Sequence, residues 1–220
     1  MHLVIISCSP RAQKDSNTSK IIERFKAGFE KESHTTEVHY LFMKNTWASI
    51  REAFDRNEHI LFAVPLFVEC IPGIMLEFLE TLKPKEYAHG AAKTKIGFIL
   101  QGGFAEASQL RCGEQYLECL PEHLNCEYTG ALIKGNMFVL GMLNDKGVKS
   151  LAAPFVDMGA YYGKHGVFPK DIVSEFAKPE YYSKTNIFFF TLLSPLQKLF
   201  FSLFARKRGC KASLNAKPYH

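Results

Sequence analysis

Apolar residues recur along residues 1–135 with two different periods, which predict alternating strands and helices. Short apolar runs predict five strands, at residues 3–7, 36–42, 59–64, 95–100 and 127–134. Apolar residues at helical spacing predict helices between them, at residues 16–31, 47–56, from Pro72 onward and over about 105–119. This alternation favours a parallel, doubly wound sheet with helices on both faces.

The segment between the first strand and the first helix is rich in hydrogen-bond donors. Residues 7–18 read Ser-Cys-Ser-Pro-Arg-Ala-Gln-Lys-Asp-Ser-Asn-Thr. Such a loop favours phosphate, because free backbone N–H groups and the positive end of the helix dipole point at it. The guanidinium of Arg11 and four short polar side chains add donors: Ser9, Ser16, Asn17 and Thr18. The simpler alternative is that Ser16 or Asn17 only caps the helix and Arg11 is a solvated charge.

Glycine-rich nucleotide loops do not explain this segment. It contains no glycine, so the dinucleotide pattern Gly-x-Gly-x-x-Gly is absent after the first strand. Residues 159–164 and 141–150 resemble a Walker A loop only loosely, because their spacing or their final residues differ from the motif.

Two other predicted strands end in loops suited to a flat ligand. Residues 65–73 read Pro-Leu-Phe-Val-Glu-Cys-Ile-Pro-Gly, and residues 101–106 read Gln-Gly-Gly-Phe-Ala-Glu. Backbone groups of such loops can bond the polar edge of a ring while apolar side chains cover its face. Paired glycines let the backbone approach closely. Each loop taken alone is equally typical of an ordinary strand-to-helix turn, in which Pro72 starts the helix.

Together, the three loops resemble those of the NADPH-dependent FMN reductase group in the flavodoxin-like superfamily. That group has Gly-Ser-x-Arg followed by Ser-Asn-Thr, and here the matching residues are Cys8-Ser9-Pro10-Arg11 and Ser16-Asn17-Thr18. Phe67 takes the aromatic place of the second loop. Cys8 stands where the group has glycine, which would narrow the loop and weaken phosphate binding. The resemblance covers roughly residues 1–135.

The resemblance implies a flavodoxin-like three-layer α/β sandwich. Its five-stranded parallel sheet has the order 2-1-3-4-5, and the ligand lies beside the first strand at the carboxyl ends. We expect residues 1–180 to form this FMN-binding domain. Residues 181–220 are expected to form an amphipathic helical extension that is not an independent domain.

The same resemblance implies FMN as the cofactor. It assigns the phosphate to Ser9, Arg11, Ser16, Asn17 and Thr18. It assigns ring contacts to Pro65, Leu66, Phe67, Val68, Gln101, Gly102 and Gly103. No catalytic acid, base or nucleophile is expected among the side chains, because a flavin itself carries out hydride transfer.

The implied activity is that of an NAD(P)H-dependent oxidoreductase. NADPH or NADH would donate a hydride, and the acceptor would be a small molecule: a quinone, azo compound, nitroaromatic, metal complex or free flavin. A flavodoxin-like electron carrier and a non-catalytic FMN-binding regulatory protein remain as alternatives. The basic balance of the chain speaks against a carrier, because carriers of this type are usually acidic.

Composition limits the remaining classes of function. The chain has 220 residues, 47% of them hydrophobic, and a formal net charge of +5. The basic residues are scattered except near the C-terminus, so a nucleic-acid partner is not expected. Six cysteines without a Cys-x-x-Cys pair, behind an N-terminus that begins with a strand, predict reduced thiols in the cytoplasm and no metal site.

The C-terminal residues differ from the rest. Residues 187–205 are nearly all apolar and run into Arg206-Lys207-Arg208, but Pro195 and Lys198 near the middle disfavour a spanning helix. One helix face after Pro195 is apolar: Leu196, Leu199, Phe200, Leu203 and Phe204. We expect this face to pack on the core or on a second subunit, as a homodimer or larger homo-oligomer. Contact of residues 195–208 with an anionic membrane surface is the open alternative.

Overall fold

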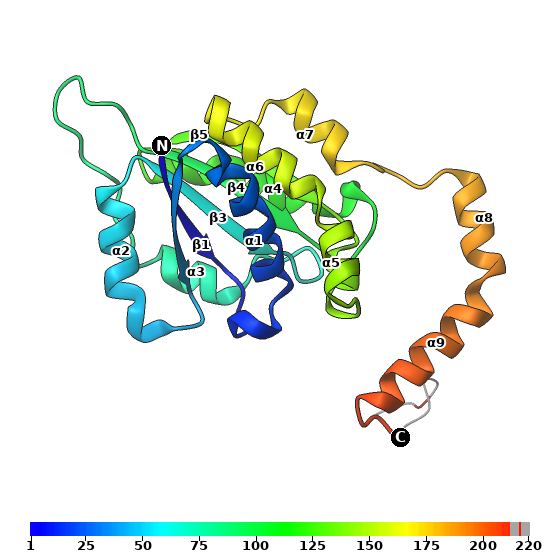
Figure 1. Cartoon of the computed structure of the whole chain (residues 1–220). Coiled ribbons are helices and arrows are strands. Elements are labelled where there is room, and N and C mark those ends of the chain that lie inside the picture. The colour runs from blue at the N-terminus through cyan, green and yellow to red at the C-terminus, as the bar shows by residue number, and fades with distance from the viewer. Residues whose placement is uncertain (212–215, 217–220) are drawn as a thin grey trace. The chain divides into compact units, whose positions relative to one another are not determined.

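Five parallel strands form one sheet in the order β2-β1-β3-β4-β5 (Figure 1). They are β1 (His2–Ser7), β2 (Thr35–Tyr40), β3 (His59–Pro65), β4 (Lys95–Gln101) and β5 (Glu127–Lys134). The computed structural model describes residues 1–211 and 216, except the side chain of Glu32. The interior strands are buried apolar runs, as expected when both faces of a parallel sheet are covered. The predicted flavodoxin-like order is therefore confirmed.

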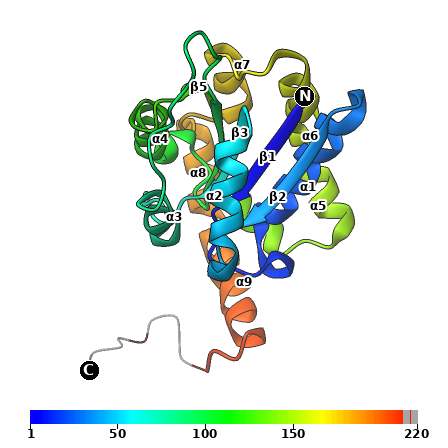
Figure 2. The same cartoon turned by 90° about the vertical axis from the view of Figure 1, so that its left-hand side faces the viewer.

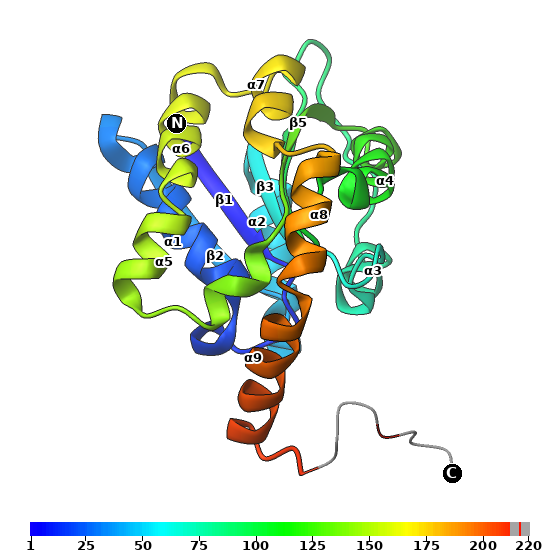
Figure 3. The same ribbon diagram turned by 90° about the vertical axis from the view of Figure 1, so that its right-hand side faces the viewer.

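Helices cover both faces of this sheet (Figures 2 and 3). The helices α1 (Asn17–Phe29) and α6 (Pro154–His165) lie on one face. The helices α2 (Trp47–Arg56), α3 (Gly73–Leu79) and α4 (Arg111–His123) lie on the other. The short helices α5 (Asp145–Leu151) and α7 (Lys170–Ala177) flank α6 in the sequence. The residue pattern predicted no element in residues 135–180, although α5, α6 and α7 lie there.

The predicted helix over 105–119 is wrong at both ends. Residues Ala107–Leu110 form a 3-10 turn, and α4 begins at Arg111 and continues to His123. The backbone N–H of Ala107 donates to the Pro179 carbonyl oxygen over 2.9 Å, and that of Ser108 donates to Glu180 over 3.2 Å. These bonds to a distant segment hold the turn, and local sequence cannot reveal them. Pro72 is the N-cap of α3 rather than its first helical residue.

Close packing of α6 against α1 holds α1 on the sheet. A Cβ atom at Gly159 would lie 2.0 Å from the carbonyl oxygen of Phe25 on α1. A Cβ atom at Gly28 would lie 1.8 Å from the carbonyl oxygen of Val156 on α6. The two backbones therefore touch at glycines from both sides, and no side chain fits between them.

The chain divides into two units by its internal contacts, residues 1–180 and a second unit that begins at Tyr181. The second unit contains α8 (Lys184–Leu192) and α9 (Ser194–Lys207), so the predicted helical extension is confirmed. Among the described residues, no single helix has the length and apolar composition of a membrane span. The pair α8 and α9, bent by 59°, satisfies length and composition only when taken together.

We expect Gly159→Ala to lower the free energy of unfolding by about 3 kcal/mol, because the added methyl group must displace backbone atoms of α1. Urea unfolding followed by circular dichroism measures this loss. Gly73→Ala is the matched control, since a Cβ atom there meets nothing within 4 Å and alanine favours a helix. Equal effects of the two substitutions would contradict the close contact.

Candidate functional site

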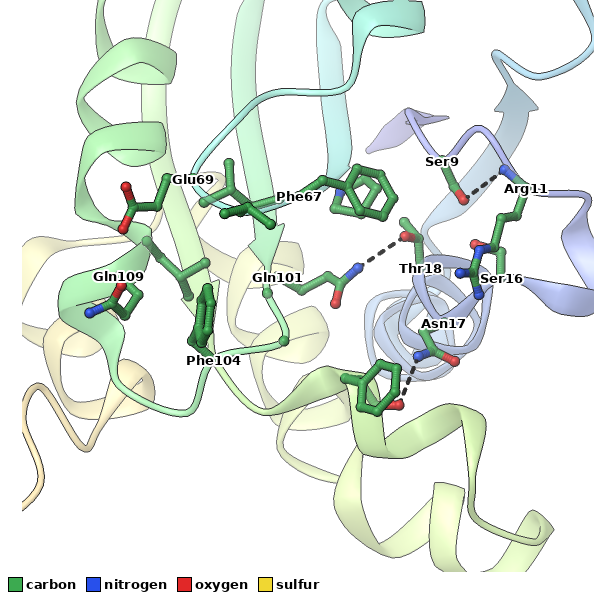
Figure 4. A pocket seen from close by; sticks show the side chains of 17 residues that line it. Ser9, Arg11, Ser16, Asn17, Thr18, Phe67, Glu69, Gln101, Phe104 and Gln109 are labelled. Atoms are coloured by element: carbon green, nitrogen blue, oxygen red, sulfur yellow. Dashed lines mark hydrogen bonds between the residues drawn. The ribbon is translucent and has the colours of Figure 1, made fainter. Parts of the chain in front are cut away.

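A pocket lies at the carboxyl ends of β1, β3 and β4, where open α/β sheets bind ligands (Figure 4). Its volume of about 360 Å³ lies within the range of small-molecule sites. All twelve residues singled out in the sequence line it: Ser9, Arg11, Ser16, Asn17, Thr18, Pro65, Leu66, Phe67, Val68, Gln101, Gly102 and Gly103. Five further residues line it as well: Glu69, Phe104, Gln109, Leu110 and Phe138. The structure thus brings the three predicted loops together, while the ligand contacts of their residues stay a prediction.

One end of the pocket is formed by the loop between β1 and α1, which carries hydrogen-bond donors. The backbone N–H groups of Asn17 and Thr18 belong to the first turn of α1, where no intrahelical acceptor exists. The exposed guanidinium of Arg11 makes no hydrogen bond or ion pair with any residue that the structure describes. The Arg11 backbone N–H donates to Ser9 Oγ over 3.2 Å, which holds the buried Ser9 in place. This end is therefore suited to an anion.

Two of the predicted donor side chains are instead hydrogen-bonded to the protein backbone. Ser16 Oγ accepts the backbone N–H of Ser19 over 3.3 Å, so Ser16 is the N-cap of α1. Asn17 Nδ2 donates to the carbonyl oxygens of Met137 at 3.0 Å and Phe138 at 3.3 Å. The capping alternative therefore holds for Ser16. An anion at this end would therefore meet the backbone N–H of Asn17, because the side-chain amide of Asn17 is already bonded to the protein.

Cys8 does not narrow the loop. Its side chain is fully buried, does not line the pocket, and places Sγ 3.6 Å from the carbonyl oxygen of Ile6. Its backbone N–H donates to the Ala63 carbonyl oxygen over 2.9 Å, which joins the loop to β3. Burial raises the pKa of the Cys8 thiol well above its usual range, so the thiol stays neutral. The departure from glycine is therefore accommodated by the core, and the expected loss of room for a phosphate is not seen.

Gln101 connects the strand ends to α1 through buried contacts. Its Nε2 atom donates to Thr18 Oγ1 over 3.4 Å, and its backbone carbonyl accepts the N–H of Leu66 over 2.7 Å. Because the Thr18 hydroxyl accepts this bond, its own hydrogen remains available to a ligand. Figure 4 shows Gln101 between the polar end, with Arg11, and the opposite end, with Phe104.

Three exposed phenylalanine side chains line the pocket, with Phe104 at the end opposite Arg11 and Phe138 beside Asn17 at the polar end (Figure 4). Phe67, Phe104 and Phe138 are 45%, 52% and 48% exposed, although phenylalanine is usually buried. Phe67 and Phe104 lie in the predicted second and third loops, whereas Phe138 follows β5, an edge strand that the sequence analysis did not connect with the site. The bonds from Asn17 bring Phe138 to the pocket, and no sequence signal identifies them. Exposed rings around one cavity provide apolar surface for a flat ligand.

The pocket offers binding groups rather than acid-base or nucleophilic groups. Arg11 and Glu69 are the charged side chains among the described residues that line it, and no histidine or cysteine is among them. Figure 4 shows Arg11 at the polar end and Glu69 near Phe104 at the other. Chemistry that needs an imidazole or a thiol is therefore not supported by these lining residues.

The loop after β3 reverses within four residues at the rim of the pocket. The backbone N–H groups of Phe67 and Cys70 each donate to the other residue's carbonyl oxygen over 3.0 Å. Val68 and Glu69 between them have φ angles of 47° and 67°. A β-branched residue at positive φ is strained, and such strain concentrates at functional sites.

We expect Val68→Asn to raise the free energy of unfolding by about 1 kcal/mol, because asparagine tolerates this left-handed conformation. Val68 is 77% exposed, so the substitution costs little burial. Val68→Ala is the control, since alanine removes the branch but retains a Cβ atom. Equal stabilities of the two variants in chemical denaturation would argue against strain at this turn.

No family model matches the chain, and no curated protein sequence matches it either. Solved structures do match. An NAD(P)H:quinone oxidoreductase from Methanothermobacter marburgensis has a TM-score of 0.57 and 15% identity, covering 77% of this chain and 97% of that protein. An FMN-dependent NADH-azoreductase from Bacillus anthracis, in complex with FMN, has a TM-score of 0.53 and 14% identity. The match covers 73% of this chain and 98% of that protein.

The general stress protein 14 from Treponema denticola, also in complex with FMN, has a TM-score of 0.52 and 11% identity. The match covers 74% of this chain and 97% of that protein. Identities this low establish the architecture and leave activity to be argued from the site. The chain therefore has the flavodoxin-like fold of these proteins, with a ligand pocket at the strand ends where that fold places one.

Proposed function

We propose that the chain is an FMN-dependent oxidoreductase that uses NADPH or NADH to reduce a flat small-molecule acceptor such as a quinone. The observation that carries the proposal is one pocket that combines a cluster of anion-binding groups with three exposed phenylalanine rings. FMN has the matching parts, a phosphate at one end and a flat ring system at the other. Two structural neighbours are a quinone oxidoreductase and an azoreductase, and FMN is bound to the azoreductase and to the general stress protein 14; both facts support the proposal.

The residues present fit FMN. The N–H groups of Asn17 and Thr18, the Thr18 hydroxyl and the Arg11 guanidinium provide donors for a dianionic phosphate. Phe67, Phe104 and Phe138 provide apolar area for the ring. Gly102 and Gly103 line the cavity; the N–H and carbonyl of Gly102 are bonded to Lys134 and Met137, whereas Gly103 is exposed and lets the ring approach the backbone. Glu69 lies at the end of the pocket opposite Arg11, away from the phosphate donors, which avoids repulsion between its carboxylate and the phosphate (Figure 4).

FMN, when bound, supplies the two-electron chemistry by taking a hydride from a nicotinamide and reducing a second substrate. The protein's own groups bind and orient the reactants. The absence of an imidazole or thiol among the described lining residues agrees with this division of labour. An open aromatic rim admits flat reactants in turn, which suits azo compounds, nitroaromatics and free flavins as well as quinones.

Charge does not decide between this enzyme and an electron carrier. Residues 181–220 contain seven Lys and Arg and no Asp or Glu, so residues 1–180 contain 20 basic and 22 acidic side chains. The basic balance that spoke against a carrier therefore belongs to the extension, and the FMN-binding domain itself is nearly neutral. Reaction with a nicotinamide is the property that separates the two functions.

We expect Arg11→Ala to weaken FMN binding about 10- to 100-fold, the range of one lost charge-assisted hydrogen bond. Fluorescence quenching of FMN during titration with protein measures the Kd. Lys14→Ala is the matched control, because Lys14 is an exposed cation of the same loop that does not line the pocket. Its Kd should stay within about threefold of wild type. Equal losses of FMN affinity in both variants would assign the effect to general electrostatic attraction of FMN by the loop rather than to a specific bond from Arg11.

We expect NADPH or NADH, added without oxygen, to bleach the visible absorbance of the FMN-loaded protein rapidly in a stopped-flow experiment. Dithionite is the control, because it reduces a competent flavin whether or not a nicotinamide can bind. Bleaching by dithionite with no reaction toward either nicotinamide would support the carrier and overturn the reductase. Protein that takes up no FMN would overturn both.

A further inference from the structure

The second unit is set apart by its charge. Its seven basic side chains face no acidic side chain of their own segment, since residues 181–220 lack Asp and Glu entirely. Three of these basic residues follow one another where α9 ends: Arg206 and Lys207 in its last turn and Arg208 as its C-cap. Lys184 begins α8, and Lys198 lies within α9. A segment whose charged side chains are all positive attracts an anionic partner.

The same unit carries exposed apolar side chains along both helices. In α8 the exposed fractions run from 42% for Phe190 to 65% for Phe188. The exposed apolar residues of α8 are Ile187, Phe188, Phe189, Phe190 and Leu192. A helix that is apolar on all sides is normally buried or in lipid. The two helices do not bury these side chains against each other, so they require another apolar environment.

The helix α9 has one continuous apolar face. Four exposed side chains lie within an arc of about 100° on one face, at 100° per residue: Leu196, Leu199, Phe200 and Leu203. Lys198 lies on the opposite side, with Ser202 next to it and the exposed Phe201 also on that side. Long basic side chains at the edges and ends of such a helix can extend to a charged surface while their stems remain with the apolar residues. The helix therefore combines an apolar face with cationic groups, as interfacial helices do.

We propose that α8 and α9 bind the surface of an anionic lipid bilayer and lie in its interface. The apolar side chains would enter the boundary between headgroups and acyl chains. Lys198 and the Arg206–Arg208 cluster would contact anionic headgroups. Tyr181 and Tyr182 at the start of the unit have the amphipathic rings that favour the same depth.

A second copy of the chain is a poorer partner for this unit. In a symmetric dimer the same patch meets itself, so two sets of seven positive charges would come together without a carboxylate between them. A spanning arrangement is also disfavoured. Lys198 would lie near the bilayer centre, and the 59° bend breaks the only pair of described helices long enough to span.

The test is sedimentation of the full-length protein with lipid vesicles. We expect binding to vesicles of phosphatidylcholine mixed with phosphatidylglycerol, and at least tenfold weaker binding to phosphatidylcholine alone. Raising NaCl from about 0.1 M to about 1 M should release most of the bound protein, because salt screens exposed charges. Equal binding to both kinds of vesicle, or retention at high salt and after carbonate washing, would overturn interfacial binding and favour a spanning segment.

Matched variants compare a position in the apolar face of α9 with one outside it. Leu203→Asn should lower the vesicle partition coefficient about tenfold or more, because a leucine no longer enters the interface. Ser202→Asn, at the adjacent position outside the apolar face, should change the partition coefficient by less than about twofold. Changing Arg206, Lys207 and Arg208 together to Gln should lower it about a hundredfold on the anionic vesicles.

Two results would contradict the proposal directly. One is equal loss of binding in the Leu203 and Ser202 variants. The other is absence of vesicle binding by the wild type together with a dimer, seen by light scattering, that dissociates in Leu203→Asn; a second copy would then cover the face. The readouts do not involve flavin, so they stand or fall independently of the oxidoreductase function.

Discussion

The position of α1 on the sheet is the constraint on which the rest of the structure depends. Its first turn stands at the carboxyl end of β1, where its free N–H groups line the polar end of the pocket. Gly28 and Gly159 hold the far end of α1 against α6 with no room for a side chain. At the near end, Ser16 caps the helix and Lys20 Nζ donates to the Leu140 carbonyl oxygen over 2.7 Å. Fixed at both ends, the helix presents its donors without rearrangement.

The same contacts shape the pocket beyond α1. Asn17 holds the segment after β5 through two carbonyl oxygens, and this places Phe138 beside the cavity. Gln101 connects the end of β4 to Thr18. Side chains that resemble ligand donors in the sequence are therefore partly engaged in holding loops together. What remains uncommitted is the set suited to a ligand: backbone N–H groups, the Arg11 guanidinium and exposed aromatic rings.

The chain also joins two units with different physical requirements. Residues 1–180 bury their apolar side chains around the sheet and carry nearly balanced charge. The unit that begins at Tyr181 exposes its apolar side chains and carries only positive charge. The mild net charge of the whole chain conceals this contrast. An average over 220 residues therefore misrepresents the electrostatics of both units.

The sequence by itself determined the alternating elements and the three loops of the pocket, and the resemblance of those loops implied the sheet order. The elements follow from local periodicity and from the general rules of parallel sheets, so strand β5 and helix α2 occur at the predicted residues. Tertiary structure decided what depends on residues far apart in the chain. The inward position of Cys8, the 3-10 turn bonded to Pro179 and Glu180, and the arrival of Phe138 each require a partner that local sequence does not specify. Hydrogen bonds and close packing between distant segments are the physical reason, because they form only once the chain has folded.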